Sequence, residues 1–229
     1  PIMGDGRFLE AEVRAWLTAN PHPARNPDQN IADLQAQLAA NALGRRLLRQ
    51  LEEETGAPAV LAYMGFVQDN AETAVKRLLA GLRDGAFELA LDEGSSIRVA
   101  VRIDHGAGRA VIDFAGTSPQ QGGNLNAPAS IAHSAVLYVF RTLIGSGSPA
   151  APLTLNPSPA GGGEERRGSQ SDDYPMEDIP LNAGVLRPLD IRLPAGCLLN
   201  PAYPAAVVAG NVETSQNIVD ALYGALGKL

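Results

Sequence analysis

The spacing of apolar residues changes once along the chain, and this change constrains the fold class. Between residues 26 and 84 apolar residues recur every three or four positions, which is the period of an amphipathic helix. Between residues 97 and 103, by contrast, Ile and Val alternate with Arg and Ala, which is the period of a half-buried strand. A helical block followed by strands predicts an α+β chain.

Two long helices are predicted in the first block. Asn26-Pro27-Asp28-Gln29 is a helix start, because Asn caps the first turn, Pro is accepted at its first position and the acid favours the positive end of the helix dipole. This helix should end at Gly56, and a second should run from Pro58 to about Asp84. A short helix over 8–17 precedes them. We expect the two long segments to form an N-terminal antiparallel helical hairpin.

The second half of the chain predicts a small antiparallel sheet and two further helices. Strands are expected at 87–91, 97–103 and 110–114, with another around 189–193. Residues 131–144 are apolar nearly all round, which is typical of a buried helix. Val207-Val208 is expected to be extended, and a last helix should start near Asn211 or Thr214 and reach the C-terminus.

Residues 145–173 differ in composition from the rest of the chain. They are rich in Gly, Ser and Pro and have no apolar periodicity, which predicts one long disordered loop. Because such a loop is unusual inside a compact domain, it is interpreted as an insertion within a single domain that covers 1–229.

The net charge and the cysteine content limit the classes of binding partner and the cellular compartment that are expected. The formal net charge of −7 disfavours nucleic acid and anionic membrane surfaces as partners. Cys197 is the single cysteine, so an internal disulfide is excluded and a reducing cytoplasm is expected. The chain has no basic and apolar leader and no apolar run long enough to span a membrane. Because it lacks an initial Met and stops at its last helix, it is expected to be a piece of a longer protein.

Two glycine-preceded helix starts carry the main candidate site. They are Gly122-Gly-Asn-Leu-Asn-Ala-Pro128 and Gly210-Asn-Val-Glu-Thr-Ser-Gln216. Helix starts present unpaired N–H groups and partial positive charge, and amide side chains can bind a cyclic amide. The predicted substrate-binding residues here are Asn124, Asn126, Asn211, Thr214, Ser215 and Gln216, with Glu213 as general base or metal ligand. Alternatively, Asn126, Asn211 and Thr214 only cap helices, and Glu213 only favours the helix dipole.

Other polar residues give weaker signals. Asp69, in a Gln-Asp-Asn run that interrupts an apolar helix, is a second catalytic candidate if it points inward, although solvent exposure also explains it. Asn182, in an Asn-Ala-Gly turn, is a further substrate-binding candidate. His133 is interpreted as a hydrogen-bonded core histidine. The sequence contains no phosphate-binding loop motif and no histidine cluster, so no cofactor-binding residues are assigned and a metal site stays unknown.

Several segments in the right order resemble the hydantoinase B/5-oxoprolinase family. Residues 204–216, Pro-Ala-Ala-Val-Val-Ala-Gly-Asn-Val-Glu-Thr-Ser-Gln, are the most specific. The others are 63–71, 112–118, 124–128, 135–142, 179–188 and 199–201, and residues 23–30 resemble the oxoprolinase branch. The 145–173 insertion, Val185, Cys197 and the lack of an upstream His/Asp stretch and a Gly-rich tail depart from the family pattern.

The resemblance implies an internal portion of an ATP-dependent cyclic-amide hydrolase, converting 5-oxoproline to glutamate and inactive by itself. A hydantoinase A-type domain or subunit would bind ATP and phosphorylate the cyclic amide, while the B-type portion handles the intermediate. ATP and a divalent metal are expected for the complete enzyme, as is an oligomer. The alternatives are a hydantoin-opening or ketone-carboxylating relative, or a non-catalytic remnant or structural interaction domain.

Overall fold

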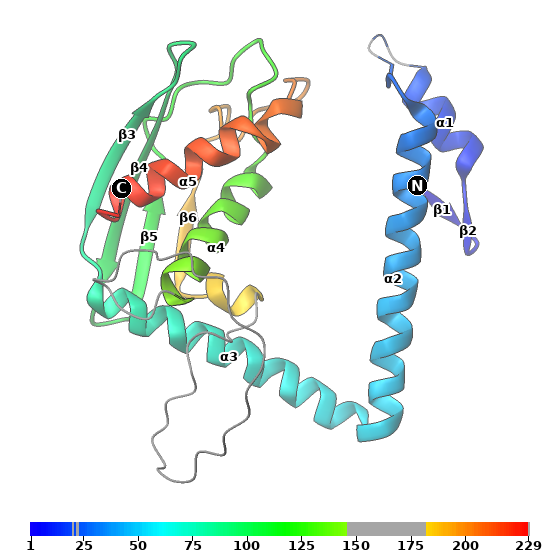
Figure 1. Cartoon of the computed structure of the whole chain (residues 1–229), viewed down its shortest axis with the longest axis horizontal. Helices are drawn as coiled ribbons and strands as arrows, with labels where there is room; N and C mark the ends of the chain where they lie inside the picture. The colour runs from blue at the N-terminus through cyan, green and yellow to red at the C-terminus, as the bar shows by residue number, and fades with distance from the viewer. Residues whose placement is uncertain (20, 22, 146–181, 229) are drawn as a thin grey trace, which may run out of the picture. The chain divides into compact units, whose positions relative to one another are not determined.

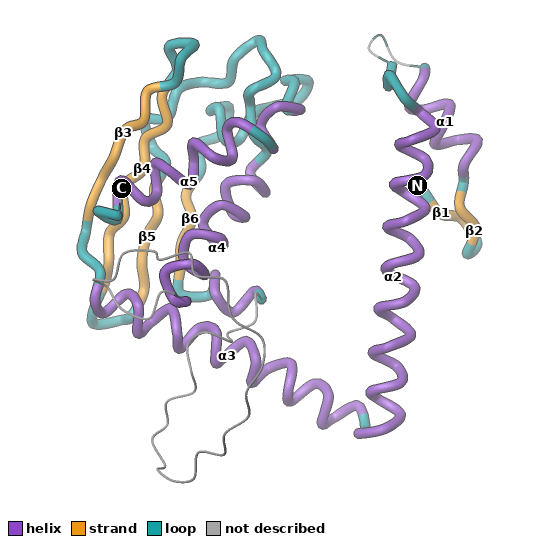
Figure 2. Tube along the Cα trace, viewed as in Figure 1, coloured by secondary structure: helices purple, strands orange, loops and turns teal. Residues whose placement is uncertain are grey.

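The computed structural model describes residues 1–19, 21, 23–145 and 182–228. These residues form two compact units, Pro1–Met64 and Gly65–Leu229. The first unit is mainly helical and the second combines a sheet with helices (Figures 1 and 2), so the α+β prediction is confirmed. Apart from Gly145, the predicted loop over 145–173 lies outside the described residues.

The N-terminal unit contains a short hairpin, in which each strand has two residues, and most of the helical region predicted between residues 26 and 84. Strands β1 (Met3–Gly4) and β2 (Arg7–Phe8) pair antiparallel before helix α1 (Glu10–Thr18). Helix α2 (Pro27–Thr55) starts and ends as predicted. The Asn26 side chain accepts a hydrogen bond from the Gln29 N–H at 3.2 Å, and Gly56 ends the helix with a φ of +84°.

Helix α3 (Ala57–Gly81) begins in the first unit and continues into the second. It ends three residues before the predicted limit at Asp84, because the chain enters a strand at Gly85. The predicted hairpin of α2 and α3 falls across the boundary between the two units and stays a prediction.

The second unit is built on a four-stranded sheet with the order β3-β4-β5-β6. Strands β3 (Gly85–Ala90), β4 (Ser96–Asp104) and β5 (Arg109–Asp113) form the antiparallel ladder that the alternating pattern predicts. Strand β6 (Leu189–Arg192) pairs parallel to β5. A parallel partner must enter the sheet from the same end as its neighbour, so a long connection separates β5 from β6 in sequence.

Helices α4 (Ala129–Gly145) and α5 (Glu213–Ala225) lie on the same face of this sheet (Figure 1). Glycine lets α5 lie close to the edge strand: a Cβ on Gly224 would lie 2.5 Å from the Phe87 ring. The core between the layers consists of side chains with almost no exposed area, among them Val75, Leu79, Ile97, Val99, Ile112, Phe114, Val136, Phe140, Ile218 and Leu222.

Several local predictions for these helices are wrong. Helix α4 is not buried all round, because Ser134 and Tyr138 are exposed on one side, Tyr138 at 55%. His133 is exposed rather than a core residue, with Nδ1 2.7 Å from the carbonyl oxygen of Ala129. Residues predicted as extended around Val208 begin a 3-10 turn, η3 (Val208–Asn211), and α5 ends at Ala225.

The loop before α4 and the turn before α5 are held directly together. The Ala209 N–H donates to the carbonyl oxygen of Asn124 at 2.9 Å, and the Thr214 hydroxyl donates to the carbonyl oxygen of Leu125. A Cβ on Gly210 would lie 2.2 Å from the carbonyl oxygen of Asn126. The two helix starts therefore meet at a contact between backbones that admits no side chain.

This contact predicts that Gly210→Ala destabilises the fold. The added methyl group would meet backbone atoms that cannot rotate away, so we expect a loss of about 1–3 kcal/mol of unfolding free energy. Urea denaturation followed by circular dichroism measures it. The matched control is Gly122→Ala in the same loop, where a Cβ has nothing within 4 Å and the change should stay within about 0.5 kcal/mol. Equal stability of the two variants would contradict the close approach.

Candidate functional site

Asn126 organises the junction from inside. Its side chain is fully buried, and Oδ1 accepts the Gln121 N–H at 2.8 Å. Nδ2 donates to the carbonyl oxygens of Gln121, Gly123 and Ala206 at 2.9–3.0 Å. Because every polar atom of this amide is bonded to backbone, Asn126 fixes the loop before α4 against the segment before α5.

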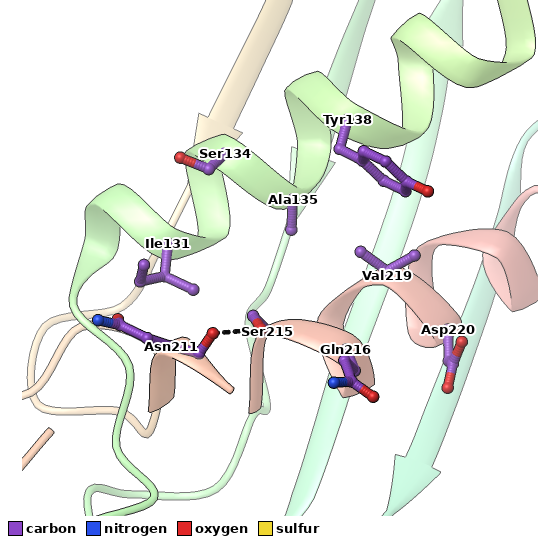
Figure 3. Close-up of a pocket in the computed structure, with 9 residues that line it drawn as sticks. All are labelled: Ile131, Ser134, Ala135, Tyr138, Asn211, Ser215, Gln216, Val219 and Asp220. Carbon is purple, nitrogen blue, oxygen red and sulfur yellow. Dashed lines mark hydrogen bonds between the residues drawn. The ribbon is translucent and has the colours of Figure 1, made fainter. Parts of the chain in front are cut away.

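A groove lies between α4 and α5, immediately beyond this junction. Its volume is about 520 Å³, within the range of small-molecule pockets. The two helices run in the same direction: Ile131 and Asn211 lie at one end of the groove, and Tyr138 and Val219 at the other (Figure 3). The lining residues are Ile131, Ser134, Ala135, Tyr138, Asn211, Ser215, Gln216, Val219 and Asp220.

The groove combines apolar and hydrogen-bonding surface. Ile131, Ala135 and Val219 offer apolar contacts, whereas the amides of Asn211 and Gln216 supply both donors and acceptors. A small ring that carries an amide needs this combination, because its methylene groups require apolar contact and its N–H and C=O require partners.

Ser215 and Asp220 add two further polar groups. The Ser215 hydroxyl donates to the carbonyl oxygen of Asn211 at 2.9 Å, the contact that is dashed in Figure 3. Its proton is therefore bonded to the turn η3 before α5, and its oxygen can still accept a hydrogen bond. Asp220 brings a carboxylate to the groove one turn beyond Gln216.

The structure separates the residues that the sequence grouped at the helix starts. Asn211, Ser215 and Gln216 line the groove. Thr214 is buried and bonded to the loop before α4, while Asn124 and Glu213 are exposed and lie outside the lining.

Sequence reasoning missed Ser134, Tyr138 and Asp220. A signal was available, because Ser134 and Tyr138 are four residues apart on one helix and Gln216 and Asp220 on the other. Residues with this spacing share a helix face.

Asp69 and Asn182 belong to a separate contact, between α3 and the 3-10 turn η2 (Ala183–Leu186). Of the two orientations that the sequence left open for Asp69, the exposed one is found: its side chain is 65% exposed and pairs with Arg187 at 2.6 Å. The same guanidinium donates to Gln68 at 2.5 Å. Asn182 donates to the carbonyl oxygen of Val67 and accepts the Gly184 N–H. These contacts hold η2 to α3.

Charges reinforce the same contact. Lys76 first, and Arg187 to a smaller extent, hold the pKa of the Glu72 carboxyl below its usual value. Asp69, more than Glu72, raises the pKa of Arg187. The two shifts favour the charged forms of Glu72 and Arg187, and the ion pairs of Arg187 with Asp69 and Glu72 keep η2 attached to α3.

Metal-ligand clusters and membrane-spanning helices are both absent from the described residues. Among residues 1–19, 21, 23–145 and 182–228, no group of three or more His, Cys, Asp and Glu side chains is placed to hold a metal ion. In the same residues, no helix is both long and apolar enough to cross a membrane.

Known proteins resemble this chain along its length. The family model described as Hydantoinase B/oxoprolinase matches residues 1–157 and 173–229. The 5-oxoprolinase PfmaA of Pestalotiopsis fici is 38% identical, and the 5-oxoprolinase of Saccharomyces cerevisiae is 39% identical. In both, the match covers 96% of this chain and 16% of the relative, so the chain spans less than a fifth of their length.

A solved structure shares the fold. The ATP-dependent caprolactamase of Pseudomonas jessenii superposes with a TM-score of 0.60 at 20% identity. The match covers 98% of this chain and 34% of the caprolactamase chain.

Because the Asn126 side chain makes these hydrogen bonds, we expect its removal to destabilise the fold strongly. Asn126→Ala removes a fully buried amide and its hydrogen bonds to four backbone groups, so we expect a loss of at least about 2 kcal/mol of unfolding free energy. Asn124→Ala removes the same amide from an exposed site two residues earlier and should change stability by less than about 0.5 kcal/mol. Paired urea titrations measure the difference, and a destabilisation by Asn124→Ala as large as that by Asn126→Ala would contradict this role.

Proposed function

Because the chain belongs to the hydantoinase B/oxoprolinase family, we propose that it is one portion of an ATP-dependent hydrolase that opens a cyclic amide. The proposed substrate is 5-oxoproline and the product is glutamate, since two fungal relatives at 38% and 39% identity are named 5-oxoprolinases. The chain covers 16% of each of them. The activity is therefore proposed for the complete enzyme, and the 229 residues alone are proposed to be inactive.

The groove between α4 and α5 is the observation that supports this substrate. The ring of 5-oxoproline carries one N–H, one C=O and one carboxylate on an otherwise apolar frame. Asn211 and Gln216 would bind the N–H and C=O, and Ile131 and Val219 would contact the methylene groups. The carboxylate would lie near the start of α5, where the helix dipole favours negative charge.

Hydrolysis also requires a base. A carboxylate can take a proton from water as the oxygen attacks the ring carbon that carries the phosphoryl group; the C–N bond then breaks and the ring nitrogen gains a proton. A second water would release phosphate from the acyl phosphate that remains. We assign the base role to Glu213, in the first turn of α5, with Asp220 as the alternative because it lines the groove. Asn126 and Thr214 would act by holding the helix starts through their side chains, and Asn124 would do so only through its carbonyl oxygen. Roles for Asp69 and Asn182 are proposed only through the α3–η2 contact.

The remaining requirements would come from other parts of the complete enzyme. A hydantoinase A-type domain or subunit is proposed to bind ATP and phosphorylate the substrate, and a divalent metal is proposed to accompany it. Among the described residues, no group of His, Cys, Asp and Glu side chains fits a site for that metal. The proposed location is the cytoplasm, where the single Cys197 would stay reduced.

Opening of a hydantoin is the second candidate. A relative from a Pseudomonas species, named as part of a putative D-/L-hydantoinase, is 26% identical over 216 residues, covering 90% of this chain and 32% of that protein. A hydantoin also presents N–H and C=O groups on a five-membered ring, so the same side chains would serve. The lower identity favours 5-oxoproline. A ketone-carboxylating enzyme or a non-catalytic remnant would convert neither 5-oxoproline nor a hydantoin.

Turnover by the complete enzyme tests the substrate. We expect phosphate release from ATP that depends on 5-oxoproline, with glutamate formed in equal amount and slower release with hydantoin. Faster release with hydantoin would replace the first candidate by the second. Phosphate release that depends on neither 5-oxoproline nor hydantoin would contradict a cyclic-amide hydrolase. A non-catalytic remnant and a ketone-carboxylating relative would then be the remaining candidates.

Substitutions in the complete enzyme test the groove. Asn211→Ala and Gln216→Ala each remove one amide contact, so we expect kcat/KM to fall about tenfold in each. Glu213→Gln should lower kcat by roughly 100-fold or more if it is the base, and Asp220→Asn should do so if Asp220 is. The matched control is Asn70→Ala, an exposed amide on α3 outside the groove, which should leave both constants unchanged. Unchanged turnover in the Asn211, Gln216 and Asp220 variants would remove this groove from the mechanism.

A further inference from the structure

The second half of α2 exposes a row of leucines. Every residue from 39 to 56 is exposed, and Leu43, Leu47, Leu48 and Leu51 retain 44–53% of their accessible area. Steps of four residues place Leu43, Leu47 and Leu51 along one face, with Leu48 beside them. We call these four residues the α2 leucine row. An apolar stripe on one side of a long helix is typical of a helix that packs against another element.

The same apolar surface continues past the end of α2 within the N-terminal unit. A shallow pocket of about 200 Å³ is lined by Leu48 and Glu52 of α2 and by Ala57, Val60, Leu61 and Met64 of α3. Leu61 is 67% exposed and Met64 46%. The α2 leucine row is therefore part of a continuous surface that a partner helix can cover.

The charges beside the α2 leucine row are arranged in two opposite blocks. Arg45, Arg46 and Arg49 come first, and Glu52, Glu53 and Glu54 follow. Within the described part of the chain, no ion pair involves any of these six side chains. Two helical turns separate Arg45 from Glu52 and Arg46 from Glu53, so each pair lies on one side of the helix.

We propose that α2 pairs antiparallel with α2 of a second copy of this chain. A two-fold axis at Arg49 would bring Arg45 and Arg46 to within one residue of the level of Glu52 and Glu53 of the second copy. The same axis would place Leu47 level with Leu51 of the second copy and repeat every contact, as a symmetric dimer requires. A parallel pair would instead place arginines against arginines and glutamates against glutamates.

The two kinds of side chain have different tasks in this dimer. Burial of the α2 leucine row drives association, because it removes apolar surface from water. The charges select the antiparallel orientation, because like charges disfavour the other one. The proposal is independent of the reaction, since none of these residues lines the groove between α4 and α5.

Charge-reversal variants of the 229-residue chain test the pairing. Sedimentation velocity should show the unmodified chain shifting, as concentration rises, to a mass twice its 23.9 kDa. A double variant with Arg45→Glu and Arg46→Glu should remain monomeric, as should one with Glu52→Arg and Glu53→Arg. An equimolar mixture of the two should form a one-to-one dimer. Circular dichroism of each variant confirms that the helices are retained.

A matched control separates specific pairing from net charge. Arg77→Glu with Arg83→Glu changes the charge by the same amount at exposed positions outside α2, and this variant should dimerise like the unmodified chain. A variant carrying all four substitutions in α2 should dimerise with itself but not with the unmodified chain. A parallel pair would give the reverse preference.

Three results would overturn the proposal. The unmodified chain could stay monomeric at every concentration, which would assign the α2 leucine row to other parts of the longer protein. The two oppositely charged variants could fail to combine. The control could lose dimerisation as fully as the α2 variants, which would show a general effect of charge.

Discussion

The approach of two backbones at Gly210 and Asn126 determines the geometry of the candidate site. A side chain at residue 210 would collide with the Asn126 carbonyl oxygen, and the buried Asn126 amide binds backbone on both sides of the contact. The starts of α4 and α5 are thereby held together, and the helices then run in the same direction. Their exposed faces enclose the groove. A small change at this junction would move every lining residue that α5 supplies.

Some of this arrangement follows from sequence because it is local. Asn26 and Gly56 mark the ends of α2 through capping and a positive φ, which involve only neighbouring residues. The alternation of Ile97, Val99 and Val101 with Arg and Ala likewise identifies β4, because one face of the strand is buried.

Other features depend on contacts between residues far apart in sequence. Residues 131–144 are apolar nearly all round, but which side is exposed depends on where α5 lies, so Tyr138 was not predicted in the groove. Asn126 and Asn211 have the same side-chain chemistry and similar local sequences. Only the fold shows that Asn126 is buried among backbone groups while Asn211 reaches the groove. The parallel pairing of β6 with β5 also depends on segments more than seventy residues apart.

The most direct test of the account is a crystal structure of the complete enzyme with bound 5-oxoproline. The ring should lie between α4 and α5, with its amide within hydrogen-bond distance of Asn211 or Gln216 and its methylene groups against Ile131 or Val219. A ring bound elsewhere, with this groove filled by side chains from another part of the enzyme, would contradict the central claim that the two joined helix starts form the substrate site.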